Sequence, residues 1–491
     1  MRPQTKSRPV LAAGRAAVVI GWACLGLSCA PLKQAGVTST APSRGPGFQQ
    51  VALGIGEDYP QEARTLAAVQ RDLQVCQTNG LKVLRISFPW DAIEPEPGRY
   101  EWGFWDTLVS LATDQYGLRL VPYVCYTPRW ASSSQGEDFW HQPPKDTTAF
   151  ANFMKKIVMR YRSRIHSWEI WNEPDNPAYW LGSVEQFASL LAAGSQAVRQ
   201  TDPNAKIVMG GLAWNLNFLE ALLTNAPALT NIDIINLHNY YETWSDDPLE
   251  RLPDYLGRAS DVLRSHGQHQ PLWMAEVGYS TFRRGPEVSG QFRAFYGYEH
   301  TPEHQAASLF RVLSMLLASG KVSLITWYRI NDLPGTQEVI GDVNNRHLGV
   351  LDEHGRPKPA LQALRYFQAL FANGFRRLDD QVQVAKTVSA PVVVHAFERP
   401  DRSVVVTAWL KTVVLGERGF PTSGQAPDTR QATIDLLLPV HGNWSAKVFN
   451  ELGQPRGTIA LGRHHGQSLI TGLPLRDGTV TVLVLEPTRR W

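Results

Sequence analysis

Two glutamates stand directly behind apolar, strand-like runs of the sequence. Glu173 lies in the segment WEIWNEP (residues 168–174), and Glu276 lies in PLWMAEVGYS (residues 271–280). Two carboxyl groups facing one sugar unit are what glycosidic-bond hydrolysis requires, because one protonates the leaving oxygen while the other attacks the anomeric carbon or activates water. A single glutamate at a strand end is more often a solvated loop residue. The hypothesis therefore depends on the fold bringing both to one place.

Such a pair needs neighbours that set the two pKa values apart. The acid must hold its proton near neutral pH, which apolar surroundings favour, whereas the nucleophile must be ionised, which hydrogen-bond donors favour. Arg85, at the end of LKVLRIS, is a candidate donor to the nucleophile, and Asn172 can donate to a sugar hydroxyl. Glu169 shares strand parity with Trp171 and would point inward, where we expect a structural ion pair rather than catalysis.

Between residues 50 and 372, short β-rich runs alternate with longer amphipathic runs, a pattern typical of βα units and a parallel sheet. The predicted strands cover residues 51–55, 81–88, 118–123, 165–171, 206–210, 232–238, 272–276 and 323–329. The predicted helices cover residues 61–78, 103–115, 147–163, 184–200, 215–224, 250–266, 302–319 and 357–371. Eight such units favour a (β/α)8 TIM barrel over an open doubly wound sheet, and no GxGxxG or phosphate loop follows any strand. Both glutamates would then face the mouth at the carboxyl ends of the strands.

Past about residue 375 the helical pattern gives way to short strand-like runs such as APVVVHAFE and TVTVLVLE. Several short strands with regular turns predict an all-β sandwich. We therefore expect the barrel to cover residues 48–373 and the sandwich to cover residues 374–491.

The order of these motifs carries a resemblance to a known group of enzymes. WEIWNEP followed by WMAEVGYS, with LRISFPW upstream and ITWYR downstream, resembles the retaining glycoside hydrolases of clan A. In that clan, the acid/base ends strand four of a (β/α)8 barrel and the nucleophile ends strand seven. Within it the chain is most similar to glycoside hydrolase family 39 and its bacterial exopolysaccharide-associated relatives, which the segments EPEPGRYEWGFWDTLV and GVLDEHGRPKPALQALR also resemble.

The resemblance implies a role for several individual residues. It makes Glu173 the general acid/base and Glu276 the nucleophile of a double displacement that hydrolyses a polysaccharide or oligosaccharide. It also implies five substrate-site residues: Asn172 on the sugar 2-hydroxyl, Arg85 on the second strand, His238 and Tyr240 in LHNYY, and Trp327 as a platform under the sugar. Asn239 replaces the commoner proline between His238 and Tyr240, which leaves Tyr240 and Tyr241 as alternatives.

Six further tryptophans fall in or near loops on the active face, and sugar stacking and loop packing are equally open for them: Trp90, Trp130, Trp140, Trp180, Trp214 and Trp244. Of these six, we predict that Trp90 binds substrate. The basic loop 281–300, with Arg283, Arg284 and Arg293, could favour acidic sugars, although a solvated loop surface is equally open.

The amino-terminal segment resembles an export signal. It contains Arg2, Lys6, Arg8 and Arg15, followed by an apolar stretch over residues 16–28, which is too short to span a membrane. The ending Gly26-Leu27-Ser28-Cys29 resembles a bacterial lipoprotein signal, with an ordinary cleaved signal and an uncleaved anchor as the alternatives. Residues 1–29 are thus predicted to direct export to the cell envelope, with a possible lipid on Cys29 as the only membrane contact, and residues 30–47 to form a flexible tether.

The net charge and the cysteine content bear on the remaining classes of ligand and on disulfide bonds. The net charge of +3, with scattered Lys and Arg, does not favour nucleic-acid binding. Cys76 and Cys125 are expected to be buried free thiols rather than one disulfide, and no motif predicts a metal or cofactor site. Two alternative functions stay open: a non-hydrolytic carbohydrate-binding envelope lipoprotein, and a transglycosylase that uses the same site.

Overall fold

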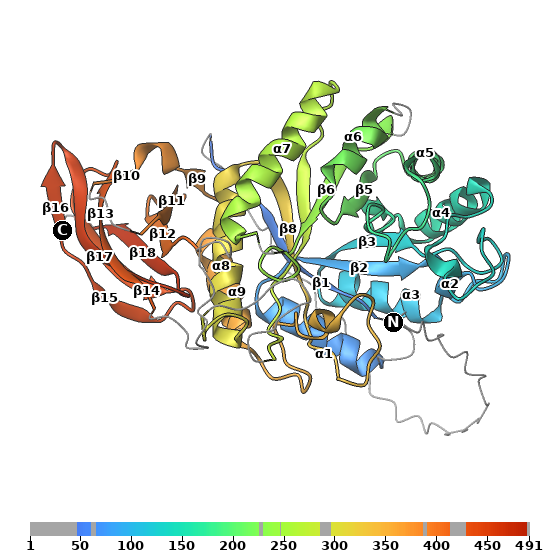
Figure 1. Cartoon of the computed structure of the whole chain (residues 1–491), viewed down its shortest axis with the longest axis horizontal. Coiled ribbons are helices and arrows are strands. Elements are labelled where there is room, and N and C mark those ends of the chain that lie inside the picture. Colours follow the sequence, from blue (N-terminus) through green and yellow to red (C-terminus); the bar gives the residue numbers. More distant parts are fainter. Residues whose placement is uncertain are drawn as a thin grey trace, which may run out of the picture. The chain divides into compact units, whose positions relative to one another are not determined.

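The eight predicted strands close into a parallel barrel (Figure 1). The computed structural model describes residues 47–59, 65–224, 229–245, 247–284, 296–385, 390–412 and 429–488. Neighbouring strands follow the chain order, and the ring closes where Ile55 pairs with Trp327. The barrel strands are β1 (Ala52–Glu57), β2 (Val83–Pro89), β3 (Arg119–Cys125), β4 (Ser167–Ile170), β5 (Lys206–Leu212), β6 (Ile234–Asn239), β7 (Leu272–Val277) and β8 (Val322–Tyr328).

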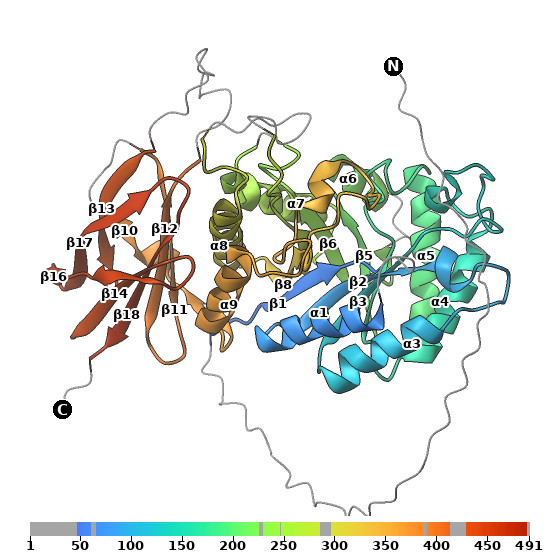
Figure 2. The same cartoon turned by 90° about the horizontal axis from the view of Figure 1, so that it is seen from below.

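Helices surround the barrel strands, as Figures 1 and 2 show. They are α1 (Leu66–Thr78), α2 (Trp90–Ile93), α3 (Gly103–Ser110), α4 (Thr147–Tyr161), α5 (Val184–Thr201), α6 (Leu216–Thr224), α7 (Leu252–Ser265), α8 (Pro302–Ser319) and α9 (Pro359–Phe371). Local sequence fixes several of their ends. Ser183 and Gln186 form a reciprocal capping box at the start of α5, and the Thr301 side chain caps α8 immediately before Pro302. The prediction of a (β/α)8 barrel is confirmed.

The barrel strands are apolar on both faces because each face is covered. Inside the barrel, away from its mouth, one small cluster of side chains fills the interior: Val83, Val121, Val208, Ile234, Trp273, Ala275 and Leu324. The other face of the strands packs against the surrounding helices in the main hydrophobic core. Polar side chains lie in the barrel interior on both sides of this layer: the site residues toward the mouth, and Arg119, which donates to Ser167, at the amino ends of the strands.

Two strands carry irregularities that matter for the site. Between β6 and β7, Asn236 pairs with Trp273 but His238 pairs with Glu276, so β7 has one extra residue in this interval. A similar shift in β5 lies between Met209 and Leu212. An extra residue in one strand reverses the direction of the side chains that follow it.

The carboxyl-terminal region forms two antiparallel sheets with strand orders β10-β13-β17-β16 and β15-β14-β18-β12-β11-β9. Their strands are β9 (Arg376–Arg377), β10 (Gln383–Val384), β11 (Val392–Glu398), β12 (Val404–Leu410), β13 (Gln431–Leu438), β14 (Trp444–Asn450), β15 (Pro455–Thr458), β16 (Leu461–His464), β17 (Gln467–Arg476) and β18 (Thr481–Pro487). A second hydrophobic core, which includes Leu436 and Ile470 of one sheet and Val406 and Leu483 of the other, joins the two sheets. The predicted β-sandwich is confirmed, and the predicted division at residues 373 and 374 falls between α9 and β9.

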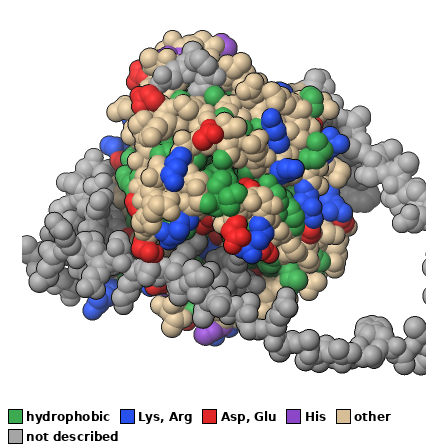
Figure 3. Space-filling view, turned by 90° about the vertical axis from the view of Figure 1, so that its right-hand side faces the viewer, with side chains coloured by type: hydrophobic (Ala, Val, Ile, Leu, Met, Phe, Trp, Pro, Cys, Tyr) green, Lys and Arg blue, Asp and Glu red, His purple; other side chains and the backbone are tan. Residues whose placement is uncertain are grey.

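Cys76 and Cys125 are buried free thiols, as expected. The predicted export segment and most of the predicted tether, with Cys29, lie outside the described residues. Among the residues that are described, no helix has the length and apolarity needed to cross a membrane. On the face in Figure 3, basic and acidic side chains lie interspersed rather than gathered into a basic stripe.

Candidate active site

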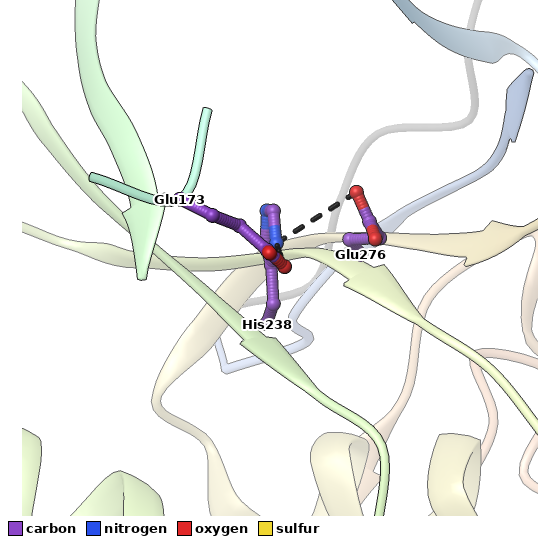
Figure 4. Close-up of side chains that lie close together, drawn as sticks. All are labelled: Glu173, His238 and Glu276. Carbon is purple, nitrogen blue, oxygen red and sulfur yellow. Dashed lines mark hydrogen bonds and ion pairs between the residues drawn. The ribbon is translucent and has the colours of Figure 1, made fainter. Parts of the chain in front are cut away.

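Glu173 and Glu276 converge at the mouth of the barrel. Glu173 follows β4, Glu276 lies at the end of β7, and both carboxyl groups approach the ring of His238 (Figure 4). One oxygen of each carboxyl group and one ring nitrogen of His238 all lie within 4.8 Å of one another. The two glutamates, 103 positions apart in the sequence, therefore share one small site.

The backbone aims both side chains into the mouth. The extra residue in β7 turns Glu276 to the interior face, although the preceding Ala275 also belongs to the interior cluster. Trp171 and Glu173 adopt left-handed φ angles of 72° and 46°, a conformation that costs energy for residues with a side chain and that concentrates at functional sites. The amide of Glu173 donates to Gly211 O at 2.9 Å, which ties this turn to the end of β5.

Arg85 is the cation at the centre of the site. Its Nε and Nη2 donate to the two oxygens of Glu169 at 2.8 and 2.9 Å, which confirms the structural ion pair predicted for Glu169. Its Nη1 donates to Glu276 Oε2 at 2.8 Å, and Nη2 also donates to Asn172 Oδ1 at 2.7 Å. One guanidinium thus holds the candidate nucleophile and orients the amide of Asn172.

His238 and Tyr240 complete the contacts of the pair. His238 Nδ1 lies 2.9 Å from Glu173 Oε1 and 3.7 Å from Glu276 Oε2. The hydroxyl of Tyr240 donates to Glu276 Oε1 at 2.7 Å, whereas Tyr241 packs edge-on against Tyr255. Of the two tyrosines left open by the sequence, Tyr240 is the one at the carboxylate.

Asn236, which sequence reasoning missed, fixes the state of His238. Its Oδ1 accepts from the Ala275 amide at 2.9 Å, and its Nδ2 donates to Glu169 Oε1 at 2.9 Å, so the amide has only one orientation. The same Nδ2 lies 3.4 Å from His238 Nε2. That nitrogen must therefore accept, which assigns the proton of a neutral His238 to Nδ1, facing Glu173.

The environment separates the two carboxyl groups electrostatically. Burial, with a smaller contribution from Asp175, raises the pKa of Glu173 to about 8. Burial also raises the pKa of Glu276 above its usual 4.5, but the Arg85 guanidinium and the hydrogen bond from Tyr240 oppose that shift. Burial lowers the pKa of His238, which keeps this ring neutral. The first proton lost by the pair therefore leaves Glu276, beside Arg85, while Glu173 keeps its own.

Glu173, His238 and Glu276 are also spaced closely enough to be considered as metal ligands. Arg85 already donates to Glu276 at 2.8 Å, and a guanidinium at that distance repels a second cation. The described residues of the site thus favour proton transfer and charge stabilisation over metal binding.

Two predicted substrate-binding residues lie elsewhere. Trp90 and Trp327 are both 0% exposed, so neither ring can stack on a sugar. Trp90 lies in α2 and stacks on Phe153, with its Nε1 donating to Glu94. Trp327 belongs to the main core outside the barrel, whereas Leu324, three residues earlier in the same strand, belongs to the interior cluster. Tyr328, one residue later, is the residue of β8 that reaches the mouth.

Asp58 is a further polar residue of the mouth, and none of the sequence motifs singled it out. It directly follows β1, and its carboxylate accepts from the hydroxyls of Tyr123 and Tyr328 at 2.5 and 3.0 Å. The rule that located the glutamates, a carboxylate just past a strand end, applies equally to Asp58 in LGIGEDYP.

Comparisons with known proteins bear on this geometry. Residues 65–291 match the family model described as cellulase (glycosyl hydrolase family 5). Endo-1,4-beta-xylanase C of Phanerodontia chrysosporium is 27% identical over 147 residues, which cover 28% of this chain and 35% of that protein. Mannan endo-1,4-beta-mannosidase 1 of Solanum lycopersicum is 24% identical over 352 residues, which cover 60% of this chain and 85% of that protein. The chain thus spans only about a third of the length of the fungal xylanase.

Solved structures show the same architecture. A family 39 glycoside hydrolase from Bacteroides cellulosilyticus WH2 superposes with a TM-score of 0.64 at 16% identity, covering 89% of this chain and 81% of that one. A monomeric beta-xylosidase from Caulobacter crescentus CB15 superposes with a TM-score of 0.62 at 17% identity, covering 91% and 98% of the two chains. At such identities the likeness establishes the fold alone. Together, the family model, the relatives and the barrel confirm the resemblance of this chain to the clan A glycoside hydrolases.

Proposed function

We propose that the chain is a retaining glycosidase that cleaves a polysaccharide or oligosaccharide by double displacement. The observation that carries the proposal is that one carboxyl oxygen of Glu173 and one of Glu276 lie within 4.8 Å of each other. Retaining glycosidases hold their carboxyl groups about 5–5.5 Å apart, whereas inverting enzymes leave about 6.5–9.5 Å for a water molecule. The spacing supports direct attack by one carboxylate on the sugar.

In the first step, Glu276 attacks the anomeric carbon while Glu173 donates its proton to the leaving oxygen, so a glycosyl-enzyme ester forms and the alcohol departs. In the second step, Glu173, now ionised, takes a proton from water, which attacks the same carbon and releases Glu276. Arg85 and Tyr240 each donate to Glu276 and stabilise its charge before attack and on release. Asn172, whose oxygen accepts from Arg85, would present its NH2 group to a sugar hydroxyl.

The relatives support a polymeric substrate. The names of the similar proteins include an endo-1,4-beta-xylanase and a mannan endo-1,4-beta-mannosidase, both of which act on polysaccharides. We further propose that the chain works in the cell envelope, exported by its basic and apolar amino terminus and anchored by a lipid on Cys29. Replacing Cys29 with alanine should move the protein from the membrane fraction to the soluble fraction; an unchanged distribution contradicts the anchor.

Azide rescue tests the two glutamate roles separately. The variant Glu276→Gly should lose hydrolysis of a 4-nitrophenyl glycoside, and added azide should restore release of nitrophenol. It should give a glycosyl azide of inverted configuration, because azide then enters from the side the carboxylate has vacated. The matched variant Glu173→Ala should instead give an azide of retained configuration, formed from the glycosyl-enzyme.

Other outcomes separate the rival functions. Near wild-type hydrolysis by Glu276→Gly removes Glu276 from the mechanism. Oligosaccharide binding by the wild type without any product after long incubation indicates a binding protein. Transfer to added acceptor sugars in preference to water indicates a transglycosylase.

A further inference from the structure

Asp58 places another carboxylate at the mouth of the barrel, beside the catalytic pair. Its Oδ1 accepts from the Tyr123 hydroxyl at 2.5 Å and from the Ser87 amide at 3.3 Å. Its Oδ2 accepts from Tyr328 at 3.0 Å, and the residue is only partly buried. A carboxylate oxygen accepts about two hydrogen bonds. Oδ1 is therefore satisfied, whereas Oδ2 has room for one more donor.

The surroundings connect Asp58 to the reacting groups. The Tyr123 ring that holds its Oδ1 lies 4.2 Å from the guanidinium carbon of Arg85, the cation that grips Glu276. Tyr328, whose hydroxyl donates to Asp58, ends β8, and β8 lies between β1 and β7 in the barrel, so Asp58 and Glu276 stand two strands apart at one mouth. A sugar in contact with the catalytic pair therefore has Asp58 within its own reach.

The nearby cations are already bound to protein acceptors. Arg85 donates to Glu169, Glu276 and Asn172, and Arg329 pairs with the buried carboxylate of Glu57. Arg283, in the loop that could have favoured acidic sugars, donates to three backbone carbonyls, those of residues 296, 297 and 299. Arg284 of the same loop is exposed, and Arg293 lies outside the described residues. The buried guanidinium groups of Arg85 and Arg329 are both paired with carboxylates, and Asp58 adds a further carboxylate beside them.

We propose that Asp58 Oδ2 accepts a hydrogen bond from a hydroxyl of the sugar at the cleavage point, and that this sugar is neutral rather than a uronic acid. The inference rests on the proposed glycosidase function and adds a substrate class to it. A sugar carboxylate in this position would face Asp58 and Glu276, while the two buried arginines described there, Arg85 and Arg329, are already paired, and like charges at such distances disfavour binding. A hydroxyl instead donates to an acceptor that Tyr328 has already oriented.

Matched substrates test whether the sugar at the cleavage point is neutral or a uronic acid. The probes are 4-nitrophenyl xyloside, mannoside, glucoside and glucuronide, in both anomeric forms; glucoside and glucuronide differ only at C6. We expect hydrolysis of at least one neutral glycoside. The kcat/KM for the glucuronide should be at least about 100-fold lower than for that neutral glycoside. Equal or faster hydrolysis of the glucuronide overturns the inference and leaves the proposed glycosidase function standing.

Two variants test the proposed role of Asp58. Because a hydrogen bond to a charged group contributes about 1.5–3 kcal/mol, Asp58→Asn should lower kcat/KM on the neutral substrate about 10- to 100-fold. The thermal unfolding midpoint should stay unchanged. The control Asp106→Asn removes an exposed carboxylate that pairs with Arg160 and should leave kcat/KM as in the wild type. A kcat/KM for Asp58→Asn within about twofold of the wild type contradicts the role of Asp58.

If none of the glycosides is cleaved, the proposed glycosidase function is contradicted. A binding measurement then tests the preference for neutral sugars by itself. Calorimetric titration of Glu276→Gln with xylohexaose, mannohexaose and cellohexaose should then show binding, and titration with an oligogalacturonide should show none. Binding of the acidic oligosaccharide alone, or of no oligosaccharide, overturns the inference.

Discussion

Replacing Glu173 with glutamine should make the protein more stable at neutral pH. Burial raises the pKa of Glu173 to about 8 in the folded protein, against 4.5 for an unperturbed glutamate. Between these two values the folded state holds a proton that the unfolded state has released, so the stability of the wild type falls as the pH rises. Glutamine cannot ionise, but its amide offers one acceptor where Glu173 offers two, to Asn176 Nδ2 at 2.8 Å and to His238 Nδ1 at 2.9 Å, so the loss of one hydrogen bond offsets part of the gain.

The size of the effect follows from the difference in pKa. At pH 7 the solution lies about 2.5 pH units above the unfolded pKa, and each unit corresponds to about 1.4 kcal/mol. Glu173→Gln should therefore gain up to about 3 kcal/mol at pH 7, but only about 1 kcal/mol at pH 5, where the solution lies only about 0.5 pH unit above the unfolded pKa and about a quarter of the unfolded chains keep the proton.

Urea unfolding followed by tryptophan fluorescence at pH 5, 6, 7 and 8 measures this gain. The control is Glu169→Gln, the same chemical change on a neighbouring buried carboxylate. Burial opposes its ionisation, but Arg85 lowers the pKa of Glu169, and breaking a buried ion pair costs about 3–5 kcal/mol. The two variants should thus shift stability in opposite directions at pH 7. An equal shift for Glu173→Gln at pH 5 and pH 8, or a loss of stability at pH 8, refutes the assignment of Glu173 as the protonated partner.

Three further predictions concern the same site. The kcat/KM of the wild type should fall above about pH 8, because Glu173 must be protonated to act as the acid, and this basic limb should vanish in Glu173→Ala with an activated leaving group. Asn236→Ala removes the donor that fixes the His238 tautomer, so kcat should fall about tenfold and the basic limb should move, whereas a role in folding alone would leave the limb in place. Gly211→Ala places a methyl group against His238 Nε2, so it should cost about 1–3 kcal/mol of stability, measured by urea unfolding, together with a lower kcat.

The sequence predicted the barrel because its signal is repeated. Eight βα units each carry the same change from strand to helix periodicity, so an error in one unit does not alter the conclusion. Glu173 and Glu276 were predictable for a related reason: both follow strands, and the carboxyl ends of all barrel strands meet at one mouth. The direction of each side chain within that mouth was harder to predict from the sequence.

Trp327 and Glu276 show why direction is harder to predict than position. Trp327 stands at the end of β8, but the interior direction of Leu324, three residues earlier, turns it outward and brings Tyr328 inward. Glu276 should face outward by the same counting from Ala275, and only the extra residue in β7 turns it inward. A bulge leaves no periodic signal in the sequence, so counting gave no warning for Glu276. Trp90 depends on packing of a short helix, which is likewise decided in three dimensions.

Arg85 explains how this barrel can hold so many buried carboxylates at once. A buried charge is costly unless it is paired and hydrogen-bonded, and Glu169 and Glu276 both lie in the interior. The planar guanidinium of Arg85 donates in separate directions to β4, to the turn after β4 and to β7, so one cation serves two carboxylates and an amide. The pair with Glu169 fixes the guanidinium, and this leaves Nη1 aimed at Glu276. Glu169 is therefore best understood as the residue that positions Arg85, and Arg85 as the residue that keeps the nucleophile ionised while burial keeps Glu173 protonated.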